Sequence, residues 1–387
     1  MVTTLYPQKL ITPDAVITQG CVQWDENGTI LFAGAITQAP FNKDTAIDAT
    51  TLTAVPGLID MHVHGGFGIT FGLGELAIGL EEYAQKVVQY GVTGFILTIS
   101  GPDSAFLTDR IARYAALLEK KYDGAQPLGI HLEGPFLNPA RHGAFNPDWI
   151  HGISIMEMQR YIDAGQGWIR HVSLAPELDG SAQAAQLLER NGIRAALGHS
   201  DADYETAAQA LAADFTHVTH TFNTQSGLHH RRPGVVGAIL TSERASAELI
   251  ADGQHVHPAA VRILVKCLGP ERVCLITDAM PGAGLPDGSY QLLGREVQVV
   301  NGAARLPDGT IAGSTVMMND CLRNMATLVN TPLPDAARMA ATNPARVLGY
   351  GDKLGRLIKG YTADIALLDG DLRVKMTIRK GKIIFKE

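Results

Sequence analysis

Short runs of apolar residues, separated by polar loops and helix-like stretches, follow one another through most of the chain. The stretches between the runs, such as residues 109–120 and 181–191, repeat alanine and leucine every three or four residues, as amphipathic helices do. Eight such β-α units predict a TIM (β/α)8 barrel, although an open doubly wound sheet would show the same alternation. The predicted strands are residues 58–61, 94–99, 128–132, 169–174, 194–197, 215–218, 247–250 and 273–276.

Both ends of the chain show a different pattern, with short β-branched or apolar runs separated by turns. The predicted strands are residues 16–18, 21–24 and 29–32 near the start, and 363–368, 375–378 and 382–385 near the end. We therefore expect a small β-sandwich domain formed from both termini, residues 1–54 plus 346–387, beside a barrel of residues 55–345.

Composition narrows the function without identifying it. The chain has 387 residues, a formal net charge of −7 and only 6% aromatic residues, so it offers neither the basic surface nor the stacking platform of a nucleic-acid-binding protein. Its four cysteines form no C-x-x-C pair, as expected in a reducing compartment. The start has no signal-peptide pattern and no apolar run is long enough to span a bilayer, so we expect a cytoplasmic protein without a membrane partner.

Polar side chains follow six of the eight predicted strands. The carboxyl ends of barrel strands form the face that carries active sites, and imidazole and carboxylate groups are suitable ligands for zinc or iron. Their convergence on one face favours a closed barrel with a metal site. These strand-end residues are His62, His64, Glu133, His199, His220, His255 and Asp278.

Four other histidines have a structural interpretation. His217 faces opposite to His220 by strand alternation, so His220 is the preferred ligand. His131 shares its direction with Glu133 but lies deeper in the strand. His151 and His171 stand alone, as hydrogen-bonded structural histidines commonly do.

Several motifs, in their order along the chain, resemble those of the N-acetylglucosamine-6-phosphate deacetylases of the amidohydrolase superfamily. The first, residues 56–66, contains the H-x-H pair that opens the metal site of that superfamily. The resemblance covers nearly the whole chain. The other matching segments are residues 131–135, 198–200, 250–257, 275–280, 312–315 and 343–345.

The resemblance implies a divalent metal, zinc or iron, with one or two ions per chain. Glu133, His199 and His220 would hold the main ion, while His62 and His64 would help to hold a second one. Asp278 would act as the catalytic acid and base, and the family resemblance also implies a homodimer. The implied substrate-binding residues are His255, Asn223, Thr224, Arg231 and His142.

Three segments depart from the family pattern. Phe145 stands where a histidine is usual in the loop after strand three, and His142 lies near enough to substitute for it. Thr224 and Gln225 replace an Ala-Met pair, and the loop of residues 65–74 lacks an aspartate that is usual near Thr70.

The predicted reaction is metal-dependent hydrolysis of the acetamide of N-acetylglucosamine 6-phosphate to glucosamine 6-phosphate and acetate. The run of residues 227–231 also resembles relatives that act on the galacto epimer, so N-acetylgalactosamine 6-phosphate is the first alternative substrate. A hydrolase of cyclic amides is a more distant alternative. The third alternative is a protein that binds a metal or a sugar phosphate without catalysis. The presence of Asp278, the residue that would act as acid and base, argues against it.

Overall fold

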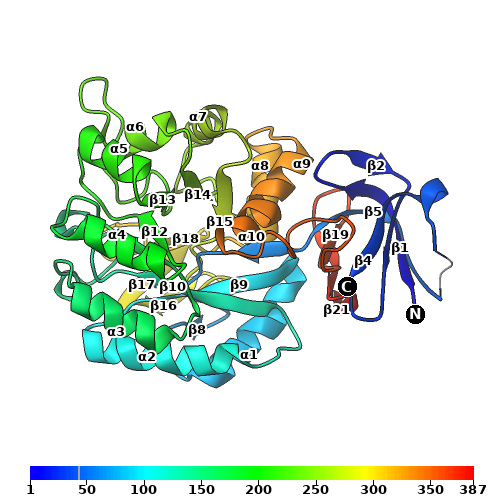
Figure 1. Ribbon diagram of the computed structural model, residues 1–387, viewed down its shortest axis with the longest axis horizontal. Coiled ribbons are helices and arrows are strands. Elements are labelled where there is room, and N and C mark those ends of the chain that lie inside the picture. Colours follow the sequence, from blue (N-terminus) through cyan, green and yellow to red (C-terminus); the bar gives the residue numbers. More distant parts are fainter. Residues whose placement is uncertain (42–43) are drawn as a thin grey trace.

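The structure is a computed structural model that describes residues 1–41 and 44–387, and residues 42 and 43 of the predicted terminal β-domain lie outside that description. Two large sheets dominate it, a parallel barrel and a terminal sheet beside the barrel (Figure 1). Eight parallel strands pair in chain order, which confirms the predicted barrel. They are β6 (Leu58–Asp60), β9 (Val92–Ile99), β10 (Gln126–Glu133), β11 (Ile169–Leu174), β12 (Arg194–Leu197), β13 (Phe215–Val218), β14 (Ser246–Ile250) and β15 (Val273–Ile276).

Polar contacts between the first and last strands close the barrel. The carboxylate of Asp60 accepts hydrogen bonds from the backbone N–H of Thr277 at 3.2 Å and from its hydroxyl at 2.5 Å. Just beyond, Val63 and Ala279 form a parallel bridge. The segments that follow β6 and β15 are therefore held side by side.

Helices surround the barrel and cover the outer face of its strands (Figure 1). Strands such as β9 are buried along their whole length because they contact helices outside and barrel residues inside. The helices are α1 (Leu76–Lys86), α2 (Ser104–Leu118), α3 (Ile155–Gly165), α4 (Ser181–Arg190), α5 (Tyr204–Ala212), α6 (Gly234–Thr241), α7 (Pro258–Leu268), α8 (Met318–Thr327), α9 (Leu333–Ala337) and α10 (Asn343–Val347).

An apolar cluster connects the barrel strands to α10. Ile59, Ile96 and Ile276 from three strands form one buried cluster with Ala345 and Val347 of α10. This packing places α10 against the first, second and last strands of the barrel.

Strands from both termini form one mixed sheet, which confirms that the two ends of the chain share one β-structure, although β1 and β5 were not among the predicted strands. β5 pairs in parallel with β1 and antiparallel with β19, which joins the two ends of the chain. Gly57 leads from β5 into β6, where a Cβ atom would lie 2.3 Å from the hydroxyl of Thr93. The strands are β1 (Thr3–Ile11), β2 (Val16–Thr18), β3 (Gly20–Trp24), β4 (Ile30–Ala35), β5 (Thr45–Pro56), β19 (Ile365–Leu368), β20 (Val374–Arg379) and β21 (Lys382–Lys386).

Two smaller sheets lie at the barrel's loops. A short hairpin of β7 (Gly65–Gly66) and β8 (Ile69–Thr70) follows the H-x-H pair. After the last barrel strand, β16 (Gly288–Leu292), β17 (Arg295–Val300) and β18 (Ala303–Arg305) form an antiparallel sheet. Leu292 and Val297 of this sheet pack in one buried cluster with Leu137 and Phe145, which places the sheet beside the loop after β10.

The described residues contain no helix that combines the length and apolar character needed to cross a bilayer.

The terminal sheet contains a buried carboxyl group, Asp364, that makes stability depend on pH. Burial raises the pKa of Asp364 from 3.8 to about 6, although its Oδ1 accepts a hydrogen bond from the backbone N–H of Lys380 at 2.7 Å. Because the folded pKa lies above the unfolded one, this stability is present below about pH 4 and is lost as the pH rises through about 6. We expect Asp364→Asn, which stays neutral, to gain in Tm relative to wild type between those limits. Thermal unfolding at several pH values tests this, and a Tm difference independent of pH would contradict it.

Candidate active site

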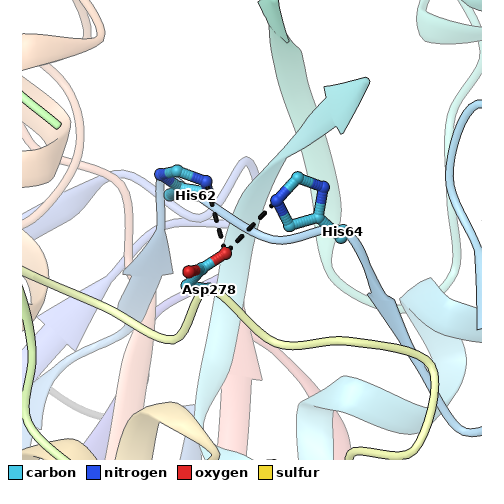
Figure 2. Close-up of side chains that lie close together, drawn as sticks. All are labelled: His62, His64 and Asp278. Atoms are coloured by element: carbon cyan, nitrogen blue, oxygen red, sulfur yellow. Dashed lines mark ion pairs between the residues drawn. The ribbon is translucent and has the colours of Figure 1, made fainter. Parts of the chain in front are cut away.

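Two histidines and an aspartate meet where the barrel closes (Figure 2). His62 and His64 follow β6, and Asp278 follows β15. The Oδ1 atom of Asp278 lies 3.4 Å from Nε2 of His62 and 3.2 Å from Nε2 of His64. These three residues, called cluster one below, form a candidate metal site.

A second candidate site, cluster two, consists of Glu133 at the end of β10, His199 after β12 and His220 after β13. The Oε1 atom of Glu133 lies 3.2 Å from Nε2 of His199 and 3.0 Å from Nε2 of His220. The two Nε2 atoms are 3.1 Å apart. A divalent cation fits this donor set of one carboxylate and two imidazoles.

Glu133 joins the two clusters. Its Oε1 faces His199 and His220, while its Oε2 lies 3.1 Å from Nε2 of His64 and 3.5 Å from Nε2 of His62. The structure therefore brings all five predicted metal ligands together with the predicted catalytic Asp278.

The electrostatic surroundings favour a cation. Burial opposes protonation of His62, yet the carboxylates of Glu133, Glu248 and Asp278 outweigh burial and raise its pKa well above the ordinary value. Burial likewise opposes ionisation of Asp278, but His62 and His64 lower its pKa. Buried charges of this density require a counter-charge, which a divalent ion would supply.

Three residues of the two clusters have positive φ angles, which residues other than glycine rarely adopt. The φ angles are +47° at His199, +25° at His220 and +50° at Asp278. Left-handed residues other than glycine cost free energy and are concentrated at functional sites. The turns that follow three different strands thus direct these side chains into the two clusters, and the backbone of each turn is strained.

Residues outside the predicted set orient the predicted ones. The ring Nδ1 of His199 lies 2.7 Å from the carbonyl oxygen of Arg141, so Nε2 faces cluster two. The ring Nδ1 of His255 lies 2.6 Å from Oδ2 of Asp252. Sequence reasoning missed Asp252, and the signal was its position three residues before His255 on the same loop.

Glu248 of β14 is a second missed residue. It is fully buried, and its Oε2 lies 2.9 Å from Nδ1 of His62. Burial would raise the pKa of Glu248, but His62, His171 and His217 hold it well below the ordinary value. The signal was a charged residue inside an otherwise small or apolar strand.

A cavity of about 310 Å³ opens above the clusters, within the size range of small-molecule sites. Three predicted substrate-binding residues, Asn223, Thr224 and His255, line it together with Leu292, the last residue of β16, and Ile311, which follows β18. The remaining lining residues are His64, Glu133, Gly143, Ala144, Phe145, His199, His220, Phe222, Asp278, Leu293, Thr310 and Gly313.

Two of the residues that depart from the family pattern, Phe145 and Gln225, lie in different surroundings. Phe145 lines the cavity, with its ring edge-on to His199 at a centroid distance of 5.1 Å. Gln225 is buried instead, and its amide nitrogen donates to the carbonyl oxygen of Thr219 at 2.8 Å. Gln225 therefore fixes the loop that carries Asn223 and Thr224.

Two predicted substrate-binding residues lie outside this cavity lining. The Nδ1 atom of His142 lies 3.2 Å from the carbonyl oxygen of Phe145. Arg231 is exposed and lines a separate hollow of about 660 Å³ with Arg141 and Asp201.

The histidines with a structural interpretation lie away from the cavity. His131 is buried in the barrel between Oγ1 of Thr98, at 3.1 Å, and Oγ of Ser173, at 2.8 Å. His171 and His217 are also buried in the barrel. His151 is 44% exposed.

Comparisons with known proteins identify relatives of this chain. The profile of the Amidohydrolase family matches residues 53–384. An N-acetylgalactosamine-6-phosphate deacetylase from Escherichia coli O157:H7 is 39% identical over 85% of this chain and 86% of its own length. An N-acetylglucosamine-6-phosphate deacetylase from Vibrio furnissii is 37% identical over 96% and 91%. A variant of the Mycobacterium smegmatis enzyme, solved with N-acetyl-D-glucosamine-6-phosphate, is 33% identical with a TM-score of 0.91, covering 100% of this chain and 99% of the other.

Proposed function

This chain belongs to the N-acetylglucosamine-6-phosphate deacetylase family of the amidohydrolase superfamily, and on that premise we propose a reaction and roles for its residues. The reaction is metal-dependent hydrolysis of the acetamide of N-acetylglucosamine 6-phosphate, which releases acetate and glucosamine 6-phosphate. The observation that carries the proposal is the pair of candidate metal sites, cluster one and cluster two, which Glu133 joins beside a cavity that His255 also lines.

The donor sets indicate how a metal would be held. Glu133, His199 and His220 would bind one ion, and His62 and His64 would bind a second beside Asp278. A mixture of imidazole and carboxylate ligands suits zinc or iron, and we propose one or two ions per chain. When bound, a divalent ion supplies Lewis acidity that acidifies water and polarises the amide carbonyl.

Asp278 transfers the protons in the proposed reaction. Its carboxylate lies on the cavity wall, and its lowered pKa keeps it ionised at neutral pH, ready to accept a proton from the attacking water. The same group then protonates the amine nitrogen as the C–N bond breaks. This second transfer is needed because an amine leaves poorly as an anion.

His255 binds the substrate in this proposal. Asp252 accepts a hydrogen bond from its Nδ1, which leaves Nε2 available to accept a hydrogen bond from a sugar hydroxyl in the cavity. Asn223 and Thr224, on the loop that follows the neighbouring strand β13, offer further polar contacts.

The galacto epimer is the second candidate substrate, favoured by the 39% identity to the N-acetylgalactosamine-6-phosphate deacetylase. The two epimers differ at one sugar hydroxyl. Measuring kcat/KM for both 6-phosphates distinguishes them, and we expect the gluco epimer to have the higher value.

We further propose a homodimer in which Arg231 from a second subunit reaches the phosphate. Arg231 does not line the cavity of its own chain, and the loop that carries it also exposes Leu228, which is 58% accessible. An exposed apolar residue beside a basic cluster is suited to an interface that delivers a guanidinium group to an anion. Light scattering of the purified protein tests the dimer.

Arg231→Ala should lower kcat/KM for the phosphorylated sugar about ten- to a hundredfold. A charge-assisted contact to phosphate is worth roughly 1.5–3 kcal/mol, and that contact is absent with the bare sugar. Turnover of both sugars by this variant is the measurement. Arg232→Ala is the neighbouring control. If both variants discriminate between phosphorylated and bare sugars as wild type does, this loop does not bind the phosphate.

We propose a cytoplasmic location, for which the support is that all four cysteines are free thiols, three of them buried.

A further inference from the structure

A single buried carboxylate contacts residues of both metal clusters from inside the barrel. The Oε2 atom of Glu248 lies 2.9 Å from Nδ1 of His62, in cluster one. The same oxygen accepts a hydrogen bond from the backbone N–H of His220, in cluster two, at 3.0 Å. Glu248 is completely buried and lies outside the cavity lining, so it touches neither substrate nor solvent.

The contact with His62 determines which ring nitrogen can bind a metal. With Nδ1–H donating to Glu248, the lone pair of His62 is on Nε2, which lies 3.4 Å from Asp278 and 3.5 Å from Glu133. Carboxylates commonly fix the tautomer and orientation of metal-binding histidines in this way.

The contact with His220 acts on the backbone instead. His220 has a φ of +25°, a conformation that needs support from its surroundings. The Glu248 carboxylate holds the N–H of His220, and the Glu248 carbonyl oxygen accepts the N–H of Thr221 at 2.9 Å. Glu248 thus supports the turn that aims the His220 ring at Glu133.

The other carboxylate oxygen of Glu248, Oε1, contacts histidine rings of the barrel. Nε2 of His217 lies 3.1 Å from Oε1, and Nδ1 of His217 lies 2.7 Å from the hydroxyl of Ser246. His171 is more distant, with Nε2 at 3.5 Å from Oε1. Because both carboxylate oxygens have partners, the carboxylate has one favoured orientation.

We propose that Glu248 is a positioning residue that fixes one ligand of each metal cluster and so tunes the affinity of both. The inference deepens the proposed function, since it rests on metal binding by the two clusters. Buried residues inside the barrel then do more than pack. Glu248 of β14, supported by His217 of β13, orients His62 and His220.

Zinc affinity, measured by competition with a chelator in the full-length protein, tests this proposal. We expect Glu248→Leu to weaken zinc binding about a hundredfold and Glu248→Gln about tenfold, the range usual for loss of a carboxylate behind a metal-binding histidine. Gln loses less because its amide oxygen can still accept from His62 and His220.

Ser173→Ala is the matched control, because Ser173 is equally buried in the barrel but bonds to His131 and Thr219 rather than to a metal ligand. It should bind zinc as wild type does. If Glu248→Leu does not fold, Glu248→Gln alone decides the question.

Wild-type zinc affinity in a folded Glu248 variant, or an equal loss in Ser173→Ala, would overturn the positioning role. Failure of the proposed function is a separate result. A wild-type protein whose zinc affinity depends on Glu248 but which releases no acetate would leave this inference standing and refute the deacetylation.

Discussion

Asp278→Asn should lower kcat by about a hundredfold to ten-thousandfold, the usual contribution of a general acid–base group. The amide is nearly the same size as the carboxylate and still fits between His62 and His64. It cannot accept a proton from water or return one to the leaving amine. The loss should therefore fall on kcat, with little change in substrate affinity.

Steady-state kinetics together with metal analysis of the same sample tests this expectation. Because Asp278 is itself part of cluster one, the decisive sample is one whose cluster two remains fully loaded. A loaded Asp278→Asn protein with turnover within tenfold of wild type would assign the proton transfer to another residue.

His199→Ala should remove the metal of cluster two and abolish deacetylation. His199 supplies one of only three protein ligands there, and its ring is already oriented by the carbonyl oxygen of Arg141. With two ligands left, the site loses affinity, and the reaction loses its Lewis acid.

Elemental analysis and an acetate-release assay on the purified variant provide the measurement. His151→Ala is the control, since His151 is 44% exposed and its ring lies near Glu157 rather than either cluster. If His199→Ala retains full metal content and turnover, cluster two is not the metal site, whereas a loss in His151→Ala as well would indicate general damage.

The barrel could be predicted from the sequence because each strand is a short buried run that ends in a polar turn. The predicted and observed bounds agree to within two residues, as for Ile169–Leu174 and Val273–Ile276. Strand alternation favoured His220 over His217 as a ligand; in the structure the His220 ring lies 3.0 Å from Glu133, whereas the His217 ring lies 3.1 Å from Glu248.

The terminal strands were harder to predict because their patterns are interrupted. β1 has Pro7 and Lys9 in its middle, where the pairing with β5 shifts register. Residue alternation is therefore broken, and a nine-residue strand does not stand out. The strands β16 to β18 have more exposed, mixed positions than the barrel strands.

Contacts between residues that are far apart along the chain could not be predicted from the sequence pattern. Asp278 lies against His62 and His64 because β6 and β15 close the barrel, and no local pattern states which strands are neighbours there. Glu248 was missed for the same reason, since its partners are 31 and 186 residues away. The placement of Arg231 outside the cavity likewise depends on how a long loop folds.

The most direct test of the account is acetate release from N-acetylglucosamine 6-phosphate by the wild-type protein, before and after removal of metal with a chelator and after metal is restored. The account predicts release that stops on chelation and returns when zinc or iron is added back. Release that persists in fully metal-free protein, or no release from fully loaded protein, would contradict it.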